Sequence, residues 1–174
     1  MRILRKLMVF LMVALLLAIC SCGYRLTSQQ DLSSPVAGKK IAIPVFVNKS
    51  YRANIGAFMT ESLVDLFARR SGGKVVSEDA ADLVLSGTVV SYASNPASYT
   101  DIDTVKEYRA VVTVEGTLTE KNTMKVLWKG TISWGQDYPV NSVVAKQQNN
   151  EEAAIREACA KLAQIIYDRA SAGF

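Results

Sequence analysis

The sequence predicts an α+β domain of two layers, in which two helices cover one face of a four-stranded mixed sheet. Three observations lead to this prediction. Several segments alternate apolar and polar residues, as half-buried strands do, and two segments repeat apolar residues at steps of three and four, as amphipathic helices do. These segments follow one another in the order β-α-β-β-β-α. One apolar sheet face therefore has two helices available to cover it.

The first predicted strand is Lys40–Val47 (KIAIPVFV). Pro44 has no backbone N–H to donate to a sheet, so we expect this strand at an edge. A helix follows and ends with Arg69 and Arg70 in its last turn, before Gly72. Its apolar positions are Ile55, Phe58, Met59, Leu63, Leu66 and Phe67.

The second predicted strand is Leu83–Ala93, followed by a loop over residues 95–105. Residues 108–119 show the clearest alternation in the chain, and a hairpin connects them to a strand over Val126–Trp134. We expect the apolar face to be core and the polar face to lie away from the helices. The apolar face carries Ala110, Val112, Val114 and Leu118, and the polar face carries Arg109, Thr113, Glu115 and Thr117.

The second predicted helix is Glu151–Ala170, with Asn150 as its amino-terminal cap. Its apolar stripe comprises Ile155, Ala158, Cys159, Leu162, Ile165 and Ile166.

The amino terminus has the pattern of a secretory signal. Arg2, Arg5 and Lys6 precede an uninterrupted apolar run, Leu7–Ile19, and no acidic residue occurs before Asp31. A membrane-spanning helix needs about twenty such residues, so the run is too short for a permanent span. A buried helix is the alternative, but a helix inside a domain rarely begins with this charge pattern.

Most of the excess of basic over acidic residues comes from that signal. The sequence has 20 lysines and arginines and 16 acidic residues, for a net charge of +4. Without the three basic residues of the signal, 17 cations face 16 anions, for a net charge of +1. Nucleic acid is therefore not an expected partner.

The end of the signal resembles the lipobox of bacterial lipoproteins. In the stretch Ile19-Cys20-Ser21-Cys22, an aliphatic residue lies three positions before Cys22 and a small residue directly before it. The resemblance implies cleavage before Cys22 and its modification with N-acyl and S-diacylglycerol groups. Cys159 is then the only other cysteine of the mature chain. The alternative is an ordinary signal followed by a Cys22–Cys159 disulfide in an oxidising compartment.

No pattern in the sequence indicates catalysis or a cofactor. Histidine is absent, which excludes a histidine-based nucleophilic triad and imidazole metal ligands. The acidic pairs Asp79/Asp82 and Asp101/Asp103 do not have the spacing of a complete calcium loop, so we interpret them as solvated loop residues. Cys159 is predicted to be a buried thiol, and Trp128 and Trp134 are predicted to be core residues.

An ordered set of short motifs resembles the LptE family of lipopolysaccharide-assembly lipoproteins of the outer membrane. The motifs cover nearly the whole mature chain, and the final helix matches as well. They are Cys-Gly-Tyr-Arg-Leu at 22–26, Ile-Pro-Val-Phe-Val-Asn at 43–48, Ala-Asp-Leu-Val-Leu-Ser-Gly-Thr at 81–88, Glu-Tyr-Arg-Ala-Val-Val-Thr-Val at 107–114 and Val-Leu-Trp at 126–128.

This resemblance implies a signal at 1–21, a lipidated tether at 22–39 and an LptE-like domain at 40–174. It implies a protein without catalytic activity or cofactor that plugs the β-barrel LptD and assists lipopolysaccharide transport to the cell surface. Gly23 after the cysteine favours the outer membrane, with the domain facing the periplasm and the barrel lumen.

The resemblance also implies basic lipopolysaccharide contacts in two regions. Lys146 matches the first region, before the last helix. Lys106 lies at the end of the second, a loop that here carries Asp101 and Asp103. Two alternatives remain open: an assembly lipoprotein of another envelope secretion machine, and a lipoprotein enzyme facing the periplasm.

Overall fold

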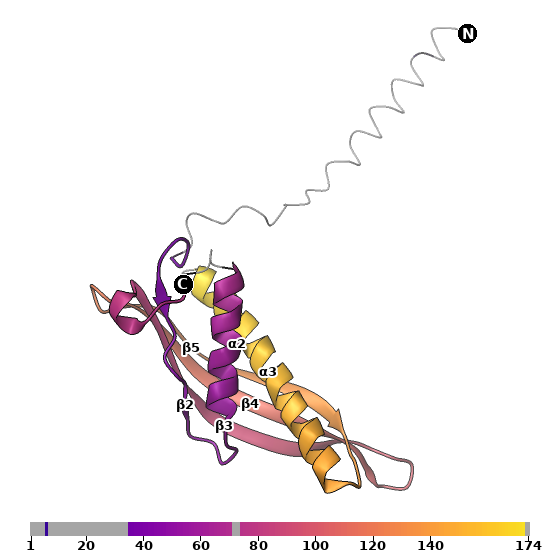
Figure 1. Cartoon of the computed structure of the whole chain (residues 1–174). Coiled ribbons are helices and arrows are strands. Elements are labelled where there is room, and N and C mark those ends of the chain that lie inside the picture. Colours follow the sequence, from indigo (N-terminus) through magenta and orange to yellow (C-terminus); the bar gives the residue numbers. More distant parts are fainter. Residues whose placement is uncertain (1–5, 7–34, 71–73, 173–174) are drawn as a thin grey trace. The chain divides into compact units, whose positions relative to one another are not determined.

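Two helices lie on one face of a mixed sheet in the computed structural model of the chain (Figure 1). The structure describes Lys6 and residues 35–70 and 74–172, and the account below concerns the unit Asp31–Phe174. The predicted fold class and element order are confirmed. The elements are β1 (Ile41–Ala42), β2 (Val47–Asn48), α2 (Ile55–Arg70), the short 3-10 helix η1 (Glu78–Ala80), β3 (Leu83–Tyr99), β4 (Val105–Glu120), β5 (Lys125–Pro139) and α3 (Val144–Ala172).

The sheet is antiparallel except at one edge. β3, β4 and β5 form an antiparallel meander, whereas β1 and β2 both pair with β3 in parallel. α2 packs on β2 and β3, α3 packs on β4 and β5, and the helices pack on each other. Both helices therefore cover the same face, and we call the opposite face the open face.

The strand predicted over residues 40–47 lies at this parallel edge but is broken in two. Residues 43–46 leave the ladder between β1 and β2, and the backbone N–H of Phe46 donates instead to the Thr60 hydroxyl, 2.9 Å away. The Phe46 ring is buried and lies so close to Gly87 that a Cβ there would overlap it. The break therefore places the Phe46 ring in the core, which the alternation of a continuous strand does not predict.

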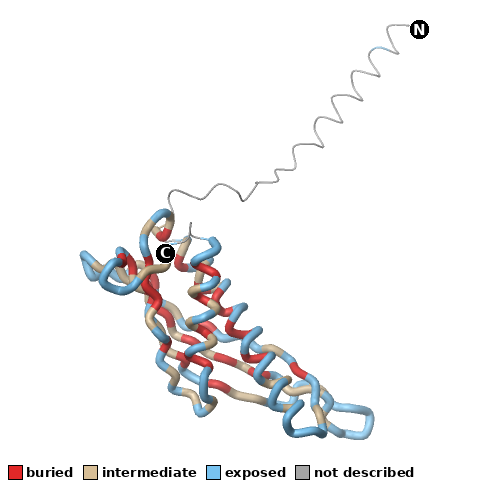
Figure 2. Tube along the Cα trace, in the orientation of Figure 1, coloured by how far each residue is buried: buried red, intermediate tan, exposed pale blue. Residues whose placement is uncertain are grey.

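The alternation predicted for the central strand is confirmed. Val112 and Val114 of β4 are fully buried, whereas Thr113 and Glu115 between them stay partly exposed on the open face. Figure 2 shows buried residues gathered where the sheet and the helices meet. The residues with no exposed surface include Ile55, Met59, Leu63, Leu85, Leu118, Leu162 and Ile166.

Three elements are longer than the sequence predicts. β3 continues to Tyr99 and β5 to Pro139, and α3 begins at Val144 rather than at Glu151. Register shifts near Pro96 allow β3 to pass this proline while it stays paired with β4. Asn150 is consequently inside α3, and its side-chain amide donates to the carbonyl of Pro139 (3.1 Å) rather than capping the helix.

The two tryptophans differ in burial. Trp128 is buried and lies over Gly116 and Gly130, where an added Cβ would approach its ring to about 3 Å. Trp134 has the same strand parity but is 37% exposed, so the prediction that it is a core residue is wrong.

Candidate functional site

Lys106 and Lys146, the two predicted ligand contacts, lie at the same end of the domain. Lys106 is the second residue of β4, and its carbonyl accepts a hydrogen bond from the N–H of Val140, 3.1 Å away. Lys146 is the third residue of α3, which begins shortly after Val140 in the chain. We call this end, formed by residues 99–106 and 139–147, the tip (Figure 1).

Hydrogen bonds to side chains fix the beginning of α3 at the tip. The Asn141 side chain accepts a hydrogen bond from the N–H of Val143 (3.0 Å), and the Gln147 side chain accepts one from the N–H of Asn141 (2.6 Å). These bonds define the entry of the chain into the helix. Lys146 is therefore in the first helical turn instead of the predicted loop, and its side chain is exposed.

The tip carries exposed apolar side chains beside these lysines. Ile102 is 82% exposed at the β3–β4 turn, and Val144 is 71% exposed where α3 begins. Tyr99, Val140 and Val143 are also exposed. A surface that combines cations with exposed apolar groups suits a ligand that has both phosphates and acyl chains.

The acidic pair Asp101/Asp103 belongs to a closed turn between β3 and β4. The N–H of Thr100 donates to the carbonyl of Thr104 (2.8 Å), and Asp103 has a φ of 56°. Within the described part of the chain, no group of three acidic, histidine or cysteine residues has the arrangement of a metal site. The two aspartates place negative charge near Lys106, which opposes anion binding there.

A polar network that the sequence does not indicate joins three elements next to the tip. The Tyr92 hydroxyl donates to Glu151 (2.6 Å), and the guanidinium of Arg52 lies 3.3 Å from the other carboxylate oxygen. Burial, together with the bond to Glu151, raises the pKa of Tyr92, so the hydroxyl stays protonated. The network joins the loop after β2, strand β3 and helix α3, which are far apart in the sequence, so no local motif could indicate it.

This network changes the role expected of Glu151. The helix predicted over Glu151–Ala170 has Glu151 in its first turn. Glu151 instead lies two turns inside α3, where Arg52 offsets its charge.

The open face of the sheet is polar, and its charges are paired with each other. Arg109 on β4 makes two hydrogen bonds to Asp137 on β5, of 2.6 and 2.7 Å, and Lys129 lies 2.9 Å from Glu115. The bond from Arg109 lowers the pKa of Asp137, so this carboxylate stays ionised. Neutralised charges and hydroxyl groups make a face that can contact another polar surface without exposing an unpaired charge.

The remaining candidate residues either are buried in the core or lie outside the residues that the structure describes. Cys159 is fully buried, and burial raises the pKa of its thiol to about 12, so it is not a reactive nucleophile at neutral pH. Cys22, the predicted lipidation site, lies outside the described residues. No helix in the described ranges is long and apolar enough to cross a membrane.

Comparison with protein families gives one match that covers most of the chain. The family described as LptE, lipopolysaccharide-assembly, matches residues 38–170. A search of curated proteins gives no match.

Several solved structures share the fold. A protein from Xanthomonas campestris aligns with a TM-score of 0.57 and 11% identity, over 79% of this chain and 86% of its own. A hypothetical protein from Chlamydia trachomatis aligns with a TM-score of 0.55 and 10% identity, over 79% and 98%. Lipoprotein B from Nitrosomonas europaea aligns with a TM-score of 0.53 and 15% identity, over 78% and 84%. At these identities the similarity concerns the fold alone.

Proposed function

The chain belongs to the LptE family of lipopolysaccharide-assembly proteins, and from this premise we propose that it is a non-catalytic outer-membrane lipoprotein that binds and plugs an LptD-type β-barrel. In this role it assists the transport and assembly of lipopolysaccharide at the cell surface. The match over residues 38–170 is the observation that carries the proposal. Three features of the chain support its separate parts.

The open face supports the barrel partnership. The lumen of a large outer-membrane barrel is polar. A face made of threonines, serines and the paired charges Arg109–Asp137 and Lys129–Glu115 suits contact with such a lumen, because it leaves few charges without partners. The helices on the other side supply the apolar core that keeps the strands of this face in register.

The tip supports lipid binding. Lys106 and Lys146 offer two exposed cations to phosphate groups, and exposed residues such as Ile102 and Val144 offer apolar contacts to acyl chains. Lys146 is the stronger candidate because Asp101 and Asp103 lie in the turn before Lys106. The tip thus offers few cations, and we expect both charge and apolar contacts to contribute to the free energy of lipopolysaccharide binding.

The amino terminus supports membrane attachment. Ile19, Ser21 and Cys22 have the lipobox pattern, and acylation of Cys22 attaches the protein to the outer membrane through its lipid. A single acyl chain binds membranes marginally, whereas several acyl chains give stable attachment.

The proposal is tested by capture from outer membranes solubilised in mild detergent. The full-length protein carrying a carboxy-terminal affinity tag is recovered, and the co-purifying protein and lipid are identified by mass spectrometry. We expect a large β-barrel protein and lipopolysaccharide. Thr117→Arg on the open face should reduce recovery of the barrel, whereas Ala160→Arg on the exposed side of α3 should leave it unchanged.

Two results would contradict the proposal. Recovery of components of another secretion machine without a large barrel favours the alternative assembly role. Recovery of the protein alone, with an activity that survives without any partner, favours a lipoprotein enzyme.

A further inference from the structure

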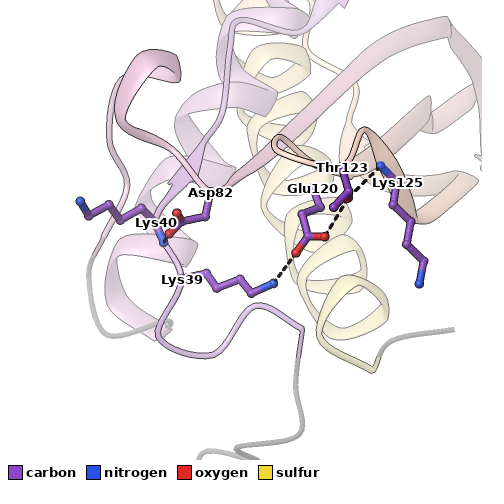
Figure 3. Close-up of polar contacts among 6 residues, drawn as sticks. All are labelled: Lys39, Lys40, Asp82, Glu120, Thr123 and Lys125. Carbon is purple, nitrogen blue, oxygen red and sulfur yellow. Dashed lines mark hydrogen bonds and ion pairs between the residues drawn. The ribbon is translucent and has the colours of Figure 1, made fainter.

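The chain enters the domain from Cys22 at the end opposite the tip. Val36 is buried in the core, and the Lys39 ammonium lies 2.9 Å from Glu120. The next residue, Lys40, donates its backbone N–H to the Asp82 carboxylate at 2.9 Å (Figure 3). These contacts fix residues 36–40 against the end of β4 and the start of β3. We call this end, formed by residues 35–41, 74–82 and 120–126, the base.

The base is the end at which the chain from Cys22 joins the domain. Twelve residues lie between Cys22 and Pro35, and an extended chain across these thirteen steps spans at most about 45 Å. β3 and β4 each run from one end of the domain to the other, so the tip lies a full strand length further away.

Three lysines at the base have no ion-pair partner among the described residues. Lys40, Lys74 and Lys125 are exposed. Figure 3 shows the side chains of Lys40 and Lys125 directed away from Asp82 and Glu120. Glu120 already has a partner, because Lys39 and the Thr123 hydroxyl bind its two oxygens, and these bonds lower its pKa.

The base carries five lysines and four acidic side chains, so its net charge is +1. The acidic side chains are Glu78, Asp79, Asp82 and Glu120. The ammonium of Lys121 binds the backbone carbonyls of Glu78 and Asp79, at 2.7 and 3.1 Å.

Exposed apolar residues flank one of the free lysines. Met124 is 74% exposed in the β4–β5 turn with a φ of 54°, and Val126 is 53% exposed at the start of β5. Lys125 lies between them. Apolar side chains interleaved with lysines at a surface are typical of contact with a lipid headgroup layer, where the apolar groups enter the interface and the cations meet phosphates.

We propose that the base docks on a membrane surface that contains anionic phospholipids. In this arrangement Lys40, Lys74 and Lys125 contact headgroup phosphates, and Met124 and Val126 enter the interface. The location of this surface rests on the proposed acylation of Cys22, but the docking chemistry belongs to the base itself. Docking would add a second attachment to the acyl chains and would orient the domain with its tip away from the membrane surface that holds the anchor.

The test uses the mature chain from residue 22 with Cys22→Ser, so that no acyl chain contributes. Its binding to vesicles of phosphatidylethanolamine and phosphatidylglycerol is measured by co-sedimentation at two salt concentrations, with phosphatidylcholine vesicles as the neutral reference. We expect preferential binding to the anionic vesicles that weakens with salt. Each basic residue near an anionic surface contributes about fivefold in affinity, so the triple change of Lys40, Lys74 and Lys125 to Ala should weaken binding on the order of 100-fold.

A matched variant removes the same charge elsewhere. Lys49→Ala combined with Lys161→Glu lowers the net charge by the same three units at exposed positions outside the base, and this control should bind nearly as the parent chain does. Met124→Ser with Val126→Ser keeps the charge and should weaken binding several-fold. Circular dichroism verifies that every variant is folded.

Equal loss in the triple lysine variant and in the matched control would overturn the proposal, because net charge alone would then explain binding. Equal binding to anionic and neutral vesicles would also overturn it. Capture of the barrel protein by the full-length chain separates this result from the proposed function. If the barrel is absent while the base variants still lose vesicle binding, the proposed function fails and the docking surface stands.

Discussion

Neighbouring residues on β4 have opposite tolerance for charge. Val112 is fully buried under the helices, whereas Thr113 lies on the open face and its hydroxyl donates to Ser133 (3.2 Å). We predict that Val112→Asp destabilises the domain by about 4 kcal/mol or more, because it buries a charge with no partner. Thr113→Asp places the same charge one position along and should cost under about 1 kcal/mol. Chemical denaturation of both variants measures the difference, and equal losses would mean that the strand register is shifted by one residue.

Lys146 is the residue on which the proposed ligand contact depends most directly. An exposed charge contact contributes about 1 kcal/mol or less, so we predict that Lys146→Glu weakens lipopolysaccharide binding several-fold without abolishing it. Lys161→Glu, further along α3 and also exposed, makes the same charge reversal away from the tip. Binding of lipopolysaccharide is measured at low and high salt, and the difference between the two variants should shrink as salt rises. Equal affinity of Lys146→Glu and the parent chain at low salt would exclude Lys146 as a contact.

At the scale of elements, the broken edge between β1 and β2 depends on glycine opposite an aromatic ring. A Cβ at Gly87 would overlap the Phe46 ring and would also lie 2.6 Å from the carbonyl oxygen of Glu115. We predict that Gly87→Ala destabilises the domain by about 2 kcal/mol, because neither the buried ring nor the backbone can move away freely. Gly135→Ala is the control, since there the nearest atoms belong to the flexible side chain of Arg109. Thermal unfolding of the two variants should show a clearly lower midpoint for Gly87→Ala.

The sequence predicts most of these elements because their periodicity is local. The alternation over residues 108–119 and the stripes of α2 and α3 specify the buried faces directly. The errors occur where tertiary contacts decide. β3 continues past Pro96 because β4 still pairs with it, and Phe46 leaves the edge strand because the core accepts its ring.

The candidate site divides in the same way. The family resemblance indicates Lys106 and Lys146, because it places basic ligand contacts in the two regions where these lysines lie. The network of Tyr92, Glu151 and Arg52 has no such signal, because its members come from three separate elements. The early start of α3 also depends on two bonds to side-chain oxygens, from the N–H of Asn141 to Gln147 and from the N–H of Val143 to Asn141. Composition alone does not reveal them.

At the scale of the whole molecule, attachment is predicted to depend on one side chain. Cys22→Ala should leave the mature chain without acyl groups and release it from the outer membrane, unless contacts with the barrel retain it. Cell fractionation and mass spectrometry of the mature amino terminus measure both effects, and Cys159→Ala should keep the lipid because that thiol is buried in the core. An unmodified Cys22 in the parent protein, or a mature chain that begins at another residue, would contradict the prediction.

The length of α3 has a consequence for how far the domain can reach. Its 29 residues rise about 43 Å, and a bilayer with its headgroups is about 40–45 Å thick. The domain is therefore about as tall as a membrane is deep. In the proposed barrel-plug role, with the long axis of the domain along the membrane normal, the base and the tip would lie near the two opposite headgroup planes.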